Sequence, residues 1–143
     1  MPQKTWVYDP DSGGVTIPAA VKLRTEARIR RYAEQYFAGQ YTRLAIRFKG
    51  QFCYIDAYAE PVVSEGWPPS DWPEGREVYI ERLRNTPTHL CRLRYFGNEE
   101  GWGFAFFTYS NEKYTLSMYD HGSFQGTAED AFRISAAAYL NNG

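Results

Sequence analysis

Cys53, His89 and Cys91 are the residues of this chain whose types are suited to metal binding or nucleophilic catalysis. Two thiolates and an imidazole are zinc ligands, but a fourth ligand is missing, and neither Cys-x-x-Cys nor His-x-x-x-His spacing occurs. A cysteine nucleophile needs a histidine base and a third group that orients the base, and the sequence indicates no such group. We therefore expect both cysteines to be small buried hydrophobic residues, and we expect no metal and no cofactor.

Asp56 is the only carboxylate inside a predicted strand among aromatic residues. A raised pKa would suit it for general acid or base catalysis. However, Arg43 is expected directly opposite, and an ion pair would keep the carboxylate charged. Phosphate-loop, dinucleotide, serine-hydrolase and zinc-protease motifs are absent from the sequence. These observations favour a non-catalytic protein.

Arginine and aromatic side chains are the unusual feature, because aromatic residues make up 17% of the chain and twelve of its sixteen cations are arginine. Stacked guanidinium groups and rings recognise nucleobases and other planar anionic ligands. Alternation along the predicted strands places a set of candidate binding residues on one sheet face: Arg43, Arg47, Tyr54, Asp56, Tyr58, Arg92, Arg94, Phe104, Phe106, Thr115, Ser117 and Tyr119. The same pairs also stabilise sheets without binding anything, or the face is buried in a dimer.

Trp67 and Trp72 lie in an aperiodic, proline-bearing segment, residues 60–87. One hypothesis makes this segment a lid or an aromatic recognition surface, since long loops often carry function. The hypothesis that we favour makes it a stiff strap that packs both indoles onto the core or the sheet edge. Asp71, with Glu74 three residues later, is expected to cap the short helix that follows.

Positive charge is concentrated in one segment, although the net charge of the chain is −1. Eight cations and two carboxylates lie between Lys22 and Lys49. Nucleic-acid-binding domains are usually basic overall. We therefore interpret these cations as partners of acidic segments of the same chain.

Periodicity and turn residues predict the elements. A first helix is expected at residues 16–38, with Thr16 as N-cap and Gly39 as stop. A second is expected at 76–84, with Tyr79 and Leu83 pointing inward. A third is expected to begin after the cap Thr127. Strands are expected at 41–48, 52–59, 89–96, 102–110 and 113–120, with a further edge strand at 6–8. The expected connections are a two-residue loop at 49–50, a five-residue loop at 97–101 and a tight turn at 111–112.

The order α-β-β-α-β-β-β-α predicts an α+β fold: a single domain over residues 1–143, with a mostly antiparallel five-stranded sheet and the N- and C-terminal helices on one face. A strongly curved sheet is an alternative within this class. The register predicted for the strands puts Cys53, His89, Cys91 and Phe107 on the face that the helices cover.

Composition limits the protein class. With 43% hydrophobic and 23% charged residues, the chain is globular rather than disordered. Its apolar runs, such as residues 104–107, are too short to cross a membrane, and residues 1–11 do not resemble a signal peptide. Two cysteines are too few for a disulfide framework, so we expect a cytoplasmic protein with no membrane partner.

Three functions are compatible with these features. The leading hypothesis is a small non-catalytic binding module that uses the arginine and aromatic face for a protein partner or a homodimer. The second is single-stranded nucleic-acid binding on that face, assisted by Arg24, Arg28 and Arg31. The third is a ligand carrier or enzyme with a pocket between sheet and helices, closed by the tryptophan loop.

Overall fold

The computed structural model describes residues 13–140, and these form the predicted order of elements with one short strand added. The helices are α1 (Ala19–Tyr36), α2 (Arg76–Arg84) and α3 (Ala128–Tyr139). The strands are β1 (Arg43–Lys49), β2 (Phe52–Tyr58), β3 (Thr88–Arg94), β4 (Trp102–Thr108), β5 (Lys113–Ser117) and β6 (Gln125–Gly126). The strand expected at residues 6–8 lies outside the described residues.

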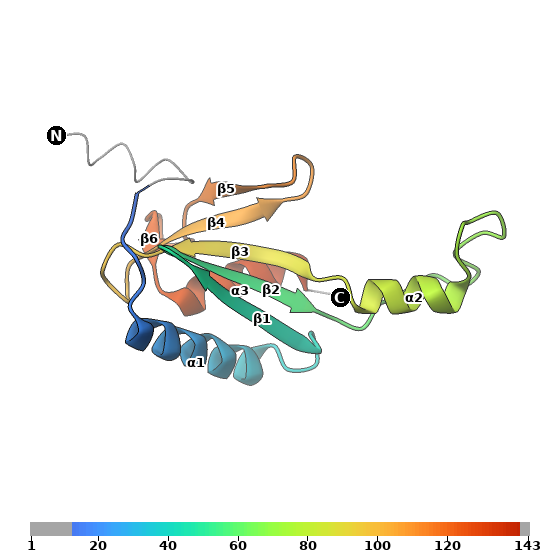
Figure 1. Ribbon diagram of the computed structural model, residues 1–143, viewed down its shortest axis with the longest axis horizontal. Helices are drawn as coiled ribbons and strands as arrows, with labels where there is room; N and C mark the ends of the chain where they lie inside the picture. The colour runs from blue at the N-terminus through green and yellow to red at the C-terminus, as the bar shows by residue number, and fades with distance from the viewer. Residues whose placement is uncertain (1–12, 141–143) are drawn as a thin grey trace.

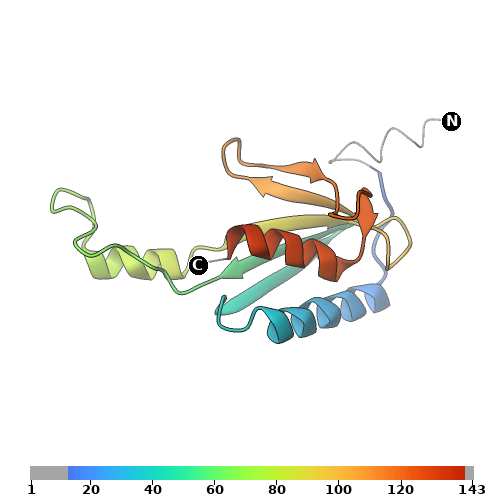
Figure 2. The same cartoon turned by 180° about the vertical axis from the view of Figure 1, so that it is seen from behind.

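The sheet is antiparallel throughout and follows the chain order β1-β2-β3-β4-β5, while β6 pairs with β4. Helices α1 and α3 lie on one side of it, as Figure 2 shows. Figure 1 looks onto the other side, which no helix of the described chain covers. The predicted α+β class, with both terminal helices on one face, is confirmed.

The core fills the space between the sheet and the two helices. Ile29 of α1, Phe132 of α3, and Ile55 and Leu93 of the sheet have no exposed surface. Full burial of such a side chain contributes about 1.5–3 kcal/mol to stability. Packed side chains therefore occupy the centre of this layer, and a pocket lies at one end of it, lined by Thr88 of β3, Leu83 of α2 and Tyr139 of α3.

The helix ends differ in how well the sequence predicts them. Helix α3 begins as expected, with the Thr127 hydroxyl accepting a hydrogen bond from the Asp130 N–H at 3.1 Å. The predicted Thr16 cap of α1 is wrong, because Pro18 precedes the first helical residue and no side chain caps it. Gly39, at φ +86°, follows the end of α1 and takes the left-handed conformation that favours glycine.

Helix α2 has the predicted bounds but not the predicted environment. None of its residues is buried, so Tyr79 and Leu83 do not point into the core. Its N-cap is Gly75 and not Asp71, and no side chain caps it. Figure 1 shows α2 and the loop before it projecting beyond the end of the sheet.

The β1–β2 hairpin has the predicted loop length at a different place. Lys49 pairs with Phe52, so the two-residue loop is Gly50 and Gln51 rather than residues 49–50. Gly50 has φ +60°, which a primed hairpin turn requires at this position. The register differs from the prediction by two residues. An even shift leaves each side chain on its expected face.

The β3–β4 register differs from the prediction by one residue, with a larger consequence. Arg92 pairs with Ala105 and Arg94 with Gly103, whereas a loop at residues 97–101 would place Arg92 opposite Phe106 and Arg94 opposite Phe104. An odd shift turns every side chain of β4 to the opposite face. Phe104 consequently faces the helices, and Phe107 faces away from them.

The two neighbouring connections complete this arrangement. Strand β5 follows β4 through a longer turn than expected, with Phe107 opposite Tyr114. A bulge between β2 and β3 leaves Leu90 as an extra residue, because Ile55 pairs with Cys91 and Asp56 with His89. The bulge moves His89 to the uncovered face, so its predicted place beside the cysteines is wrong.

No helix among residues 13–140 combines the length and the apolar character that crossing a membrane requires.

A substitution at Gly126 tests the packing at β6. A Cβ atom at this position would lie 2.7 Å from the Tyr119 ring, which is buried and donates its hydroxyl to the Trp102 carbonyl at 2.8 Å. We expect Gly126→Ala to lower the free energy of unfolding by about 1–3 kcal/mol in urea titrations. Gly75→Ala, where a Cβ atom meets nothing within 4 Å, is the control and should change it by less than about 0.5 kcal/mol. Equal stabilities of the two variants would contradict this packing.

Candidate functional site

Cations of β1 face aromatic rings of β2 along the edge of the uncovered face. The register places Arg43 opposite Tyr58, Arg47 opposite Tyr54 and Lys49 opposite Phe52. We call these six residues the arginine strip. The Arg43 Cζ atom lies 3.6 Å from the Tyr58 ring centroid, and the Arg47 Cζ atom lies 4.6 Å from that of Tyr54. Each such contact contributes about 0.5–1 kcal/mol at an exposed site.

Asp56 lies within the strip and is only 4% exposed. Its carboxylate accepts a hydrogen bond from Arg47 Nη2 at 3.3 Å and lies 2.9 Å from His89 Nδ1. The expected pairing with Arg43 is therefore wrong, because the two-residue register shift puts Ala45 opposite Asp56. A buried carboxylate is stable only when it is paired, and these two contacts provide the pairing.

Aromatic rings continue from the strip across the face. Tyr54 of β2 meets Tyr114 of β5 at 5.6 Å between ring centroids, although β3 and β4 separate their strands. Tyr114 contacts Phe107 at 5.1 Å, and Phe107 contacts His89 at 4.8 Å. Neighbouring strands lie about 4.8 Å apart, so contact over two intervening strands requires a concave face with the rings leaning inward.

Arg92 and Arg94 lie on this face but beneath its surface. They are 8% and 3% exposed. The Arg92 Cζ atom lies 4.2 Å from the Phe52 ring centroid and 5.1 Å from that of Tyr114. Arg94 lies similarly over Phe96, at 5.0 Å. The Arg92 guanidinium thus joins Phe52 of the strip to Tyr114, and neither arginine offers much surface to a ligand.

The remaining strand residues predicted for this face lie on the opposite one. Phe104 and Tyr119 are buried in the core, and Phe106 packs against Tyr139 of α3. Desolvation by burial raises the pKa of the Tyr119 hydroxyl. Because Thr115 pairs with Phe106 and Ser117 with Phe104, these two side chains share that covered side.

Three rings that the sequence does not place on the uncovered face also lie there: His89, Phe107 and Tyr114. Strand β4 carries phenylalanine at even and at odd positions, namely 104, 106 and 107, so hydrophobic alternation does not determine its register. The bulge residue Leu90 and its neighbours His89 and Cys91 include neither glycine nor proline. Only the pairing with neighbouring strands determines where these rings lie.

The basic segment is paired within the chain only in part: Arg24 and Arg28 of α1 form ion pairs, whereas Arg31 forms none with any described residue. Arg24 forms a bidentate ion pair with Glu99, at 2.7 and 3.0 Å. Arg28 lies between Glu100 and Glu129, at 2.7 and 2.8 Å, and hydrogen bonds to these carboxylates raise the pKa of Arg28 above its usual value. Arg28 thereby joins α1 to the β3–β4 loop and to α3. Arg24 and Arg28 are already paired with glutamates, so they are not available to bind an anionic ligand.

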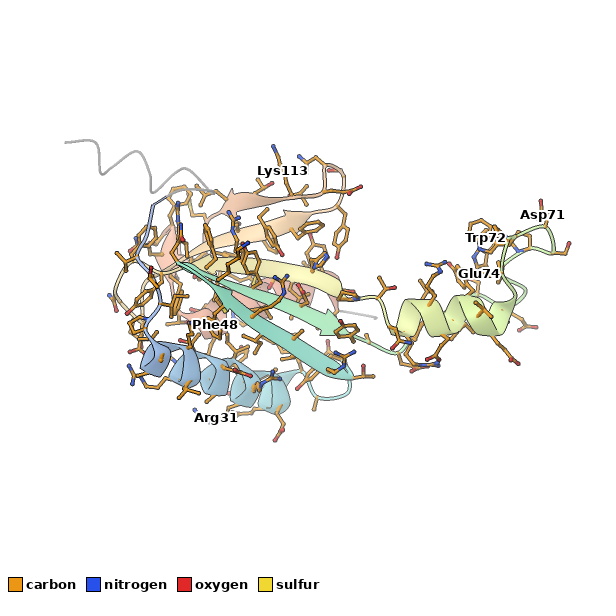
Figure 3. All side chains as sticks on the ribbon, in the orientation of Figure 1. Arg31, Phe48, Asp71, Trp72, Glu74 and Lys113 are labelled. Carbon is orange, nitrogen blue, oxygen red and sulfur yellow. The ribbon has the colours of Figure 1, made fainter. Side chains whose placement is uncertain are left out.

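Trp67 and Trp72 lie far from the sheet, so neither a strap on the core nor a lid over a central pocket describes their segment. They contact each other, with ring centroids 5.7 Å apart, and Trp72 contacts Tyr79 of α2 at 6.2 Å. They are 42% and 40% exposed. Figure 3 shows Trp72 at the outer end of the molecule, beside Asp71 and Glu74.

The two cysteines are poorly suited to nucleophilic catalysis or metal binding. Cys53 and Cys91 are both free and fully buried, and burial raises the pKa of the Cys91 thiol to about 12. A thiol is a poor nucleophile, since thiolate is the reactive form. Among residues 13–140 no three His, Cys, Asp or Glu side chains lie close enough together to hold a metal ion.

Comparison of the chain with protein-family models, curated proteins and solved structures gives no match.

The tautomer of His89 tests the geometry around Asp56. A carboxylate accepts hydrogen bonds, so in the neutral imidazole the proton should reside on Nδ1, 2.9 Å from Asp56 Oδ1. Asp56→Ala should transfer it to Nε2 and lower the free energy of unfolding by about 2 kcal/mol. Long-range ¹H–¹⁵N correlation spectra report the tautomer directly. Asp120→Ala, which removes an exposed ion pair with Arg133, is the control. An Nε2 tautomer in the unsubstituted protein would contradict the assigned contact.

Proposed function

We propose that this chain is a non-catalytic, cytoplasmic interaction module that binds an acidic segment of a protein partner along the arginine strip. The observation that carries the proposal is the pair of exposed guanidinium groups on β1, each held over a tyrosine ring of β2. A guanidinium that is already stacked loses less conformational freedom when it pairs with a carboxylate. The strip is therefore preorganised for anionic side chains.

The charge of the strip supports an acidic partner. Three cations, Arg43, Arg47 and Lys49, lie along β1 on this face, and Asp56 is the only carboxylate among the paired residues of β1 and β2. Asp56 pairs with Arg47, while Arg43 and Lys49 form no ion pair with any described residue. Two cations thus lack a partner within residues 13–140, and an acidic segment would supply it.

Nucleic acid is a less suitable ligand for this surface. Base stacking needs accessible ring faces, and Tyr54 and Tyr58 are already covered by their own arginines. Arg92 and Arg94 are buried, and Arg24 and Arg28 are paired with glutamates. A chain of net charge −1 also lacks the basic surplus that drives phosphate binding. The two free cysteines support the proposed cytoplasmic location.

Binding of a synthetic acidic peptide tests the proposal. The probe is a fluorescein-labelled peptide that alternates glutamate and tryptophan, measured by fluorescence anisotropy. We expect Arg43→Ala/Lys49→Ala to weaken its binding at least about tenfold, because two charge-assisted contacts are lost. Arg31→Ala, which removes an exposed arginine of α1 outside the strip, should leave it unchanged.

Binding should also weaken at high salt, since exposed charges are screened. Equal affinity of the double variant and the unsubstituted protein would overturn the proposed site. Tighter binding of a single-stranded poly-dT oligonucleotide than of the peptide, lost in the same double variant, would favour the nucleic-acid hypothesis instead.

A further inference from the structure

Residues 60–87 form a projecting arm, which consists of the loop after β2, helix α2 and the short link to β3. Both views show the arm extending away from the sheet and its helices (Figures 1 and 2). Helix α2 has no buried residue. A helix of nine residues is marginal in water without packing. The arm therefore needs contacts beyond those that its own chain provides.

The end of the arm is nevertheless a built structure. The Arg76 guanidinium donates hydrogen bonds to the carbonyls of Ser64 at 2.9 Å and Trp67 at 2.6 Å. Arg82 forms an ion pair with Glu74 at 2.6 Å and lies over the Tyr79 ring. These contacts fold the loop back on α2 and hold both tryptophans in place while leaving them exposed. Rigid, exposed tryptophans are the side chains that most often anchor protein interfaces.

The charge of the arm is opposite to that of the arginine strip. It carries six carboxylates and three arginines. Glu65, Asp71 and Glu77 are exposed and form no ion pair with any described residue. Two of them, Glu65 and Asp71, lie within two residues of a tryptophan. This aromatic and acidic surface is complementary to the arginine strip, where exposed guanidinium groups lie beside half-buried tyrosines.

We propose that the arm of one copy docks on the arginine strip of a second copy, and that the exchange is reciprocal. This inference rests on the proposed function and names the partner as this chain itself. Trp67 and Trp72 would pack beside Tyr54 and Tyr58, and the free carboxylates of the arm would pair with Arg43 and Lys49.

Connectivity favours a closed dimer. The arm leaves the sheet at the end of β2, the strand that supplies the rings of the strip, so both surfaces lie on the same part of the molecule. A two-fold axis can then bring both arm-and-strip contacts together at once, which closes the assembly. The arm cannot reach its own strip without folding back from the projecting position that it occupies (Figure 1).

Complementation between two variants tests this assembly. Size-exclusion chromatography with light scattering should give twice the 16.5 kDa mass of the chain for the unsubstituted protein. The strip variant Arg43→Glu/Lys49→Glu and the arm variant Trp67→Ala/Trp72→Ala should each raise the dissociation constant at least about tenfold. All four side chains are exposed, and circular dichroism will show that both variants are folded.

Mixing the two variants should restore a heterodimer, because the intact arm of one meets the intact strip of the other. Native mass spectrometry distinguishes it from either homodimer by mass. An arm variant that dimerises as tightly as the unsubstituted protein would overturn the proposal, and so would a mixture without heterodimer. A monomeric unsubstituted protein at all concentrations would also overturn it.

The same arm variant separates this inference from the proposed function. Its strip is free whether or not the chain dimerises, so it should bind the glutamate–tryptophan peptide in either case. Peptide binding by a chain that does not dimerise rejects the second copy as partner and retains the acidic ligand. If the arm variant loses dimerisation and its strip does not bind the peptide, the arm docks at a site other than the arginine strip.

Discussion

The pairing of β3 with β4 is the constraint on which both faces of the sheet depend. Side chains alternate along a strand, so the pairing of Arg92 with Ala105 decides at once that Phe104 enters the core and that Phe107 joins the arginine face. The loop between the two strands is held from outside the sheet, because Arg24 and Arg28 of α1 pair with Glu99 and Glu100. Trp102 contributes from within, since its indole N–H donates to the Glu99 carbonyl at 3.0 Å. The basic segment of the chain thus has a structural use: it fixes the loop whose length sets this register.

The uncovered face then divides into two parts with different uses. Its centre is concave and filled by its own groups, with Arg92 between Phe52 and Tyr114 and with Tyr54 meeting Tyr114 above the intervening strands. Its edge along β1 stays accessible, and there the hairpin register sets cations opposite rings. The individual contacts are weak, at about 0.5–1 kcal/mol for each exposed pair. Their joint effect is to hold Arg43 and Arg47 in place, which favours recognition of carboxylates over stacking of bases. The arm offers the matching chemistry, because its tryptophans are exposed and three of its carboxylates form no ion pair with any described residue.

Local sequence signals account for much of this fold. Turn residues and periodicity locate the three helices and five main strands, because helix stops, caps and hairpin loops depend on neighbouring residues. The two-residue loop and the Thr127 cap are examples. Register depends instead on contacts between distant segments. In β4, phenylalanine occupies both even and odd positions, so hydrophobic alternation does not favour one register. The bulge residue Leu90 is neither a glycine nor a proline. The candidate residues on β1, β2 and β3 consequently lie on the predicted face, whereas Phe104, Phe106 and Tyr119 do not. Local signals do not predict the position of the arm either, since Tyr79 and Leu83 indicate an inward face for α2 while the tertiary fold leaves the helix unburied.

The most direct measurement is a set of nuclear Overhauser contacts from the rings of β4. Phe107 should show contacts to the His89 and Tyr114 rings, whose centroids lie 4.8 and 5.1 Å away, and Phe106 should show contacts to Tyr139 of α3. This result would establish the register that places the aromatic cluster beside the arginine strip. Contacts from Phe107 to α3, with Phe106 beside Tyr114, would mean that β4 is shifted by one residue. The concave cluster would then not exist, and the account of both faces would be wrong.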